Sequence, residues 1–173
     1  RKVGTGNGTP VTGSGLLRIE KGNTTATILS GSYEVGARVI ATSGTNIAAE
    51  TTVVSCAPNC TTSGSTVVLS KAPLGPSTGI ANQAVKIFTK KFSSVTGSFE
   101  VGDVLAGTGV PAGTVVTEVG ASTLTTSQAT TSAYSSGPIT LTVPRPTAPI
   151  PFDASAEAVQ GALDAMPAFA PGE

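Results

Sequence analysis

The clearest candidates for chemistry in this sequence are its two cysteines, which lie four positions apart. Cys56 and Cys60 enclose Ala-Pro-Asn within a threonine-rich stretch. Such a pair can form a disulfide, remain as two thiols or contribute to a metal site. A four-ligand zinc site cannot be assembled from one chain that has no histidine and no second cysteine pair. The spacing therefore favours a disulfide that closes a hairpin tip, as found outside the reducing cytosol, over free thiols and over a metal.

The other polar residues give little support for catalysis. The absence of histidine excludes a Ser-His-Asp or Cys-His site. A carboxylate pair could still drive glycoside hydrolysis, but the ten acidic residues are scattered along the chain. Asp103 lacks the Asp-x-Asp-x-Asp spacing of a calcium loop, and no nucleotide-binding glycine motif is present. We therefore expect no enzyme activity, no metal site and no cofactor.

Carbohydrate could be involved either as a ligand or as a modification. Binding modules generally stack sugars on aromatic rings, and this chain has only two tyrosines and five phenylalanines. Tyr33 and Phe99 occupy equivalent places in an internal repeat, which favours core packing over a sugar platform. Sequons begin at Asn7, Asn23 and Asn59, and they would carry sugar only in a source with the glycosylation machinery.

The composition indicates a protein that associates with other surfaces. Charged residues make up 12% of the 173 residues and the net charge is zero, against a usual charged fraction of about 25%. No field is present to attract nucleic acid or an anionic membrane, and no apolar run approaches the ~20 residues of a membrane span. A neutral surface favours association. The start at Arg1-Lys2, without a signal peptide, suggests a processed product or an excised segment.

Two copies of one short motif indicate an internal repeat. GSYEVG at residues 31–36 returns as GSFEVG at residues 97–102. Three further segments match at spacings of 63, 57 and 55 residues: 47–51 with 110–114, 65–70 with 122–127, and 84–88 with 139–143. The extra residues of the first copy belong at strand junctions, because an insertion within a strand would turn every later side chain to the opposite face.

The repeated segments are rich in β-branched residues and bounded by Gly, Pro, Asn and Ser, which is typical of short strands. We predict a mainly β protein with two related β-sandwich or barrel-like modules, residues 27–92 and 93–146. The two modules should share one strand order, with Tyr33 and Phe99 in matching core pockets.

Residues 152–166 carry the helical pattern of the sequence. Its apolar residues recur at helical spacing, as Val159, Ala162, Leu163 and Met166. Asp153 or Ser155 can cap the first turn, and Pro167 ends the run. The apolar stripe should dock on a sheet, with recognition of a partner as the alternative.

Two strings resemble parts of phage structural proteins and large repetitive bacterial surface proteins. GTGVPAGTVVTEV at residues 107–119, followed by STLT at 122–125, resembles their "GTGIPAGTTVTxV" repeat and the strand after it. The string at residues 147–166 resembles a second module, in which a strand and a helix precede a further pair of strands. The first copy departs from the repeat, because residues 47–50 replace the proline turn. The resemblance implies a structural protein and brings no catalytic residues.

The same resemblance suggests that the ends of the chain are joined. Residues 147–173 would form the strand–helix part of a small α/β module, and residues 1–26 would complete such a module, of a preceding or neighbouring copy. The expected contacts join the stripe of residues 159–166 to three residues near the other end: Leu16, Leu17 and Ile19. The joining could occur within a tandem array or by strand complementation between subunits. The two alternatives to joining are closure within one chain and a coincidental likeness of low-complexity ends.

These observations favour a non-enzymatic structural repeat or subunit of an extracellular fibre, surface layer or large adhesin that assembles end to end. Its partners would be copies of itself or adjacent repeats of the same polypeptide, at the cell surface. A phage virion component, such as a decoration protein or a tail or head fibre, is the first alternative. A glycan-binding β-module of a secreted protein, with a host-surface glycan as ligand, is the second.

Overall fold

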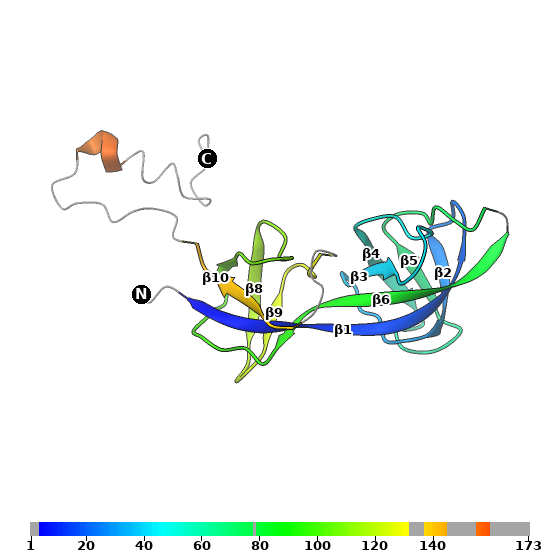
Figure 1. Cartoon of the computed structure of the whole chain (residues 1–173), viewed down its shortest axis with the longest axis horizontal. Helices are drawn as coiled ribbons and strands as arrows, with labels where there is room; N and C mark the ends of the chain where they lie inside the picture. Colours follow the sequence, from blue (N-terminus) through cyan, green and yellow to red (C-terminus); the bar gives the residue numbers. More distant parts are fainter. Residues whose placement is uncertain (1–3, 78, 132–136, 145–154, 160–173) are drawn as a thin grey trace.

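Ten antiparallel strands form nearly all the regular secondary structure of the described residues, which confirms the expected mainly β fold (Figure 1). The computed structural model describes residues 4–77, 79–131, 137–144 and 155–159. The strands are β1 Thr5–Glu20, β2 Thr25–Ser30, β3 Arg38–Ala41, β4 Thr51–Ala57, β5 Thr66–Leu69, β6 Ile80–Ser93, β7 Val104–Leu105, β8 Thr114–Val119, β9 Leu124–Thr126 and β10 Ile139–Thr142. In these ranges the helical residues are 156–159.

The first barrel is a closed ring of six strands. Around the ring the order is β1, β2, β5, β4, β3 and β6, and β6 pairs again with β1. Side chains of successive residues alternate between the inner and outer faces of a strand, so each strand contributes apolar residues to one interior. The largest of these core residues are Leu17, Ile19, Ile28, Val39, Val53, Leu69 and Ile87.

The second barrel is a ring of β1, β6, β9, β8, β7 and β10. The start of β1 pairs with β10, from Thr5 opposite Thr142 to Gly8 opposite Ile139. Two backbone hydrogen bonds of 2.8 and 2.9 Å between Ala106 and Thr142 join the end of β7 to β10 and close the ring. Its core includes Phe88, Phe92, Phe99, Leu105, Leu124 and Leu141.

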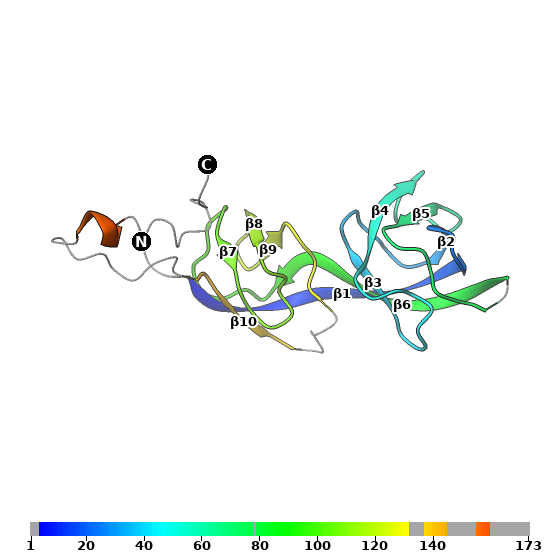
Figure 2. The same cartoon turned by 90° about the horizontal axis from the view of Figure 1, so that it is seen from above.

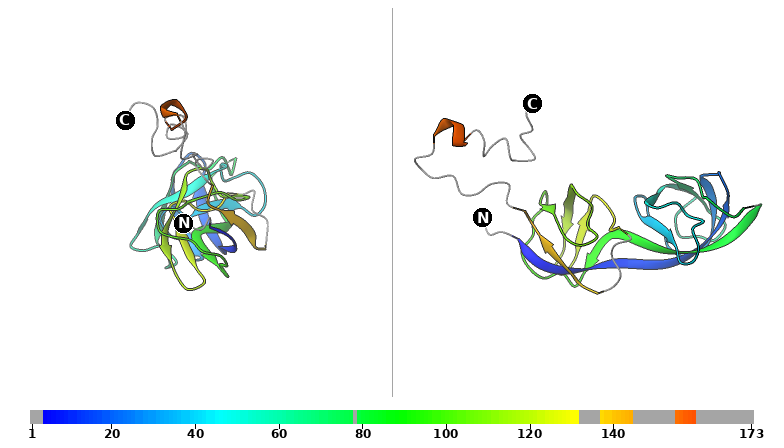
Figure 3. Two further views of the ribbon diagram at one scale, coloured as in Figure 1. Left: turned by 90° about the vertical axis from the view of Figure 1, so that its left-hand side faces the viewer. Right: turned by 45° about the horizontal axis from the view of Figure 1, so that its top comes forward.

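Strands β1 and β6 belong to both barrels and hold them end to end (Figures 1 and 2). The two strands pair with each other over most of their length, with a register shift next to Pro10. The successive β6 residues Ile87 and Phe88 point to opposite faces of the strand, so Ile87 enters the first core and Phe88 the second. The molecule is therefore elongated along these strands (Figure 3).

The second ring repeats the first, which confirms the predicted duplication. Strands β3, β4 and β5 correspond to β7, β8 and β9, while the second half of β6 takes the place of β2. The Thr51 hydroxyl lies 2.6 Å from the Ala48 carbonyl oxygen, as the Thr114 hydroxyl does from that of Pro111. Tyr33 is buried in the first core, and Phe99 in the second.

One predicted match is out of register by one residue. Val85 and Leu141 occupy the same place in the two rings, each paired with a β1 glycine and fully buried. Their spacing is 56 residues instead of the predicted 55, which had matched Val85 to the exposed Thr140. A shift of one residue exchanges the inner and outer faces of a strand, and the low-complexity string at residues 139–143 did not fix its own register.

The position of the first strand differs from the expectation that residues 1–26 complete an α/β module. Strand β1 pairs within its own chain with β2, β6 and β10. Leu17 and Ile19 are buried in the first barrel, and Leu16 is half-buried. The reason is closure, because each ring lacks a sixth strand without its half of β1. The barrels consequently share strands across the expected boundary between residues 92 and 93.

Candidate functional site at the barrel junction

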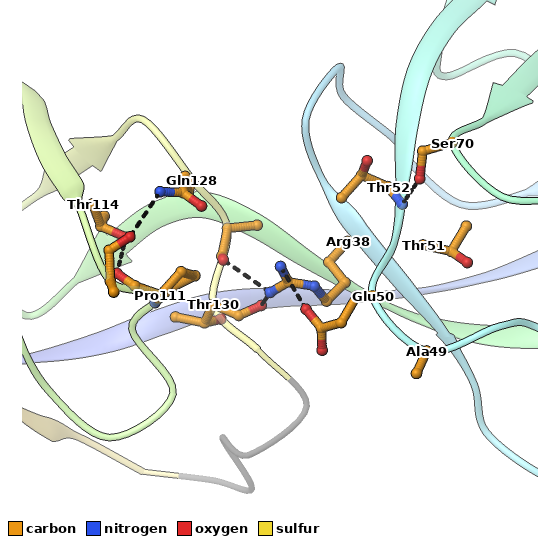
Figure 4. A network of polar contacts seen from close by, with 12 residues as sticks. Arg38, Ala49, Glu50, Thr51, Thr52, Ser70, Pro111, Thr114, Gln128 and Thr130 are labelled. Carbon is orange, nitrogen blue, oxygen red and sulfur yellow. Dashed lines mark hydrogen bonds and ion pairs between the residues drawn. The ribbon is translucent and has the colours of Figure 1, made fainter.

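The junction between the barrels contains a buried arginine. Arg38 lies at the start of β3, and its side chain reaches from the first barrel to a loop of the second (Figure 4). Its Nη1 donates to the Ala129 carbonyl at 3.0 Å and also to the Thr130 carbonyl. Its Nη2 lies 2.8 Å from the Glu50 carboxylate, which is partly exposed. The planar guanidinium can serve several acceptors at once, so one side chain ties three backbone segments together.

The acceptor loop is itself held against β6. The buried Thr126 hydroxyl lies 2.9 Å from the Lys90 carbonyl oxygen and 2.8 Å from that of Gln128. Gln128 Nε2 donates to the Ala112 carbonyl at 3.3 Å, on the side away from Arg38 (Figure 4). These contacts hold the loop in the place where Arg38 meets it.

A second contact crosses the junction at the repeated motif. The Glu34 carboxylate accepts a hydrogen bond from the Lys90 backbone N–H at 3.0 Å and lies 4.0 Å from Lys91 Nζ. Gly36 follows in the same turn with φ of +86°, and a Cβ there would lie 3.2 Å from the Lys90 side chain. Because Lys90 and Lys91 belong to the half of β6 in the second barrel, this turn also joins the two barrels.

The predicted disulfide is present between Cys56 and Cys60, whose Cα atoms are 5.1 Å apart. The Cys60 carbonyl accepts a hydrogen bond from the Tyr33 N–H at 2.9 Å, and both half-cystines pack against the first core. The Tyr33 hydroxyl donates to the Ser30 carbonyl at 3.2 Å. Burial raises the pKa of the Tyr33 phenol above its usual value.

The structure describes only part of the set of assembly residues expected from the sequence. Leu17 and Ile19 lie in the first barrel core, whereas Val159 is half-buried in the helical segment. Ser155 caps that segment, accepting a hydrogen bond from the Ala158 N–H at 3.3 Å. The remaining stripe residues, Ala162, Leu163 and Met166, and the strand expected before the helix lie outside the described residues.

Sequence reasoning missed the Arg38 contact. The usable signal was a charged residue within the apolar run Ala37-Arg38-Val39-Ile40, at a position where the second copy has Val104. A buried charge needs partners. The partners of Arg38 in the second barrel are backbone carbonyls, which every residue has, so the sequence does not identify them.

The described ranges contain few features suited to other chemistry. They hold no group of three or more His, Cys, Asp or Glu side chains that could bind a metal ion. No helix among them is long and apolar enough to cross a membrane. A shallow hollow of about 220 Å³ lies at the far end of the first barrel, lined by Arg18, Ile19, Glu20, Asn23, Thr25, Thr27 and Ile80.

No protein-family model matches this chain, and neither a curated protein nor a solved structure matches it.

Proposed function

We propose that this chain is a non-enzymatic structural repeat or subunit of an extracellular fibre, surface layer or large adhesin that assembles end to end. The observation that carries the proposal is the continuation of β1 and β6 through both barrels. Two barrels joined in this way form a spacer with a fixed axis, which is what a fibre needs from each of its units.

Shared strands give a stiffer connection than a linker. Domains joined by a linker move relative to one another unless a large interface holds them. Here, bending between the barrels would disturb the β1–β6 ladder, whose hydrogen bonds are each worth about 1 kcal/mol net. Arg38 at the start of β3 and Glu34 in the turn before it add contacts from the first barrel to the second. The junction is therefore held both by the shared strands and by these two side chains.

The surface also suits assembly outside the cell. Closed barrels remove the unpaired strand edges that would otherwise invite uncontrolled sheet extension, which leaves the ends and walls as contact surfaces. The chain has zero net charge and few charged residues, and its cysteines form a disulfide, as is common in oxidising compartments. These properties support an extracellular location.

Immunogold electron microscopy of the source cells with an antibody against residues 4–131 tests the proposal. Gold on extracellular fibres or on the cell surface is the expected result. Gold confined to the cytosol would overturn the proposal, and gold on phage particles would replace it with the virion alternative. A pre-immune serum and cells that lack the gene are the controls.

A further inference from the structure

The two free ends of the molecule repeat the two surfaces that meet at the junction. Because the rings are related by duplication, the side of the first barrel that faces the junction has a counterpart on the far side of the second barrel. We call this counterpart the open end and define it by Val101, Gly102 and Val104, which match residues 35, 36 and 38.

The surface that receives Arg38 has a counterpart as well. The loop around Ala129 in the second barrel matches the loop around Ala72 in the first. The match extends to the backbone, since the Leu74 N–H donates to Asn46 at 2.8 Å where the Thr131 N–H donates to Gly109 at 2.7 Å. We call this surface the tip end and define it by Ala72, Leu74 and Ile80, the last of which pairs with Glu20 where β1 ends.

Each end has lost the cover that its counterpart has at the junction. Gly36 lies under the Lys90 side chain, whereas a Cβ on Gly102 would meet no described atom within 4 Å. Ala129 is buried, but its counterpart Ala72 is only half-buried. The duplication thus leaves one uncovered surface of each kind.

Exposed apolar side chains lie on both uncovered surfaces, and Val35, the counterpart of Val101 at the junction, is itself 53% exposed. The three most exposed large hydrophobic side chains of the described residues are Val101 at 66%, Ile80 at 64% and Leu74 at 58%. All three lie at the two ends, and Val104 stands where Arg38 stands in the first barrel. Their position at the two ends, and not on the barrel walls, is what would be expected if the ends were contact surfaces.

We propose that the open end of one molecule docks on the tip end of a second copy, so that copies stack head to tail along the barrel axis. The proposal rests on the proposed structural function and names the surfaces involved. The occupant is a second copy because the junction already packs this pair of surfaces within one chain. Val104 would lie opposite Ala72 and Pro73, the counterparts of the Arg38 acceptors Ala129 and Thr130, with Val101 and Leu74 at the same interface. A contact between two different surfaces of the same molecule leaves one free surface of each kind on the pair, so stacking along one axis can extend into a filament.

Sedimentation velocity of the whole 173-residue chain, over a range of concentrations, tests the proposal. Val101→Glu blocks the open end and Leu74→Glu blocks the tip end. Val54→Glu is the matched control, because Val54 is 51% exposed on the wall strand β4. We expect the unchanged chain and V54E to associate alike, and each end variant alone to associate at least tenfold more weakly. A mixture of V101E and L74E should form dimers and nothing larger, since each partner keeps one working end.

Other results would overturn the proposal. A chain that stays monomeric at every concentration would mean that another part of the polypeptide covers the open end. Loss of association in V101E but not in L74E would mean that open ends pair with each other. Equal association of all variants, or weaker association of V54E as well, would place the contact elsewhere on the molecule. The proposed function would still stand in that case if the immunogold experiment labelled extracellular fibres. Thermal unfolding checks that each variant is folded. V101K takes the place of V101E, and I80E that of L74E, where the first variant does not fold.

Discussion

Arg38 of the first barrel donates a hydrogen bond of 3.0 Å to the backbone carbonyl of Ala129 in the second, across a distance of 91 residues in the chain. The contact fixes the angle between two barrels that already share two strands. Its acceptors are main-chain atoms, so it depends on the path of the loop rather than on the side chains that the loop carries. The duplicated barrel lacks the same contact, because Val104 replaces the arginine.

Replacement of Arg38 by alanine should destabilise the protein by about 3 kcal/mol, because the carbonyls of Ala129 and Thr130 would lose their buried hydrogen-bond donor. The free energy of unfolding in guanidinium chloride measures the effect. Arg18→Ala is the control, since Arg18 is exposed on β1, and it should change stability by less than about 0.5 kcal/mol. Equal effects of the two substitutions would show that the junction contact contributes nothing.

Replacement of Gly97 by alanine should be strongly destabilising. Gly97 has a φ of +100°, and a Cβ there would lie 2.5 Å from the Thr5 carbonyl oxygen and 2.8 Å from Gly6 Cα. Both obstacles are backbone atoms of β1, so we expect a loss of at least about 3 kcal/mol. Gly22→Ala is the control, with a φ of +79° in open space, and should cost only about 1 kcal/mol. Thermal denaturation measures both variants. Equal midpoints would show that contact with the β1 backbone is not what requires glycine at position 97.

Stability should fall at alkaline pH because of Tyr33. Burial raises the pKa of this phenol in the folded state, so the neutral form is favoured by folding. The contribution is complete below the unfolded pKa of about 10 and is lost as the pH rises from there towards the folded value, at up to about 1.4 kcal/mol per pH unit. Urea unfolding at several pH values above 9 measures the slope. Tyr33→Phe removes the group and imitates Phe99, and an unchanged slope in Y33F would assign the effect to other residues.

The shared strands make a prediction about fragments. A fragment of residues 27–92, the first repeat as read from the sequence, lacks β1 and should not fold cooperatively, because its ring stays open between β2 and β6. A fragment of residues 12–88 keeps all six strands of the first ring and should show a cooperative thermal transition. Circular dichroism follows both. Cooperative folding of 27–92 would mean that β1 is dispensable for the first barrel.

The sequence by itself determined the strand content, the duplication and the disulfide. Strand content follows from the period-two pattern of β-branched residues, which is local. The duplication was visible because GSYEVG and GSFEVG place a positive-φ glycine and a core aromatic at fixed positions, as Gly31 with Tyr33 and Gly97 with Phe99. The cysteine pairing followed from proximity in the chain, since four residues separate the two sulfur-bearing side chains.

Only the tertiary structure decided which barrel each strand serves. A strand of 16 residues such as β1 carries the same local pattern whether it closes one ring or two, and the choice depends on partners as distant as β6 and β10. The register of β10 was likewise left open by a repeated Thr and Leu string, and pairing with Gly6 and Gly8 fixed it. The Arg38 contact depends on both rings, because their closure places the Ala129 carbonyl 3.0 Å from its guanidinium.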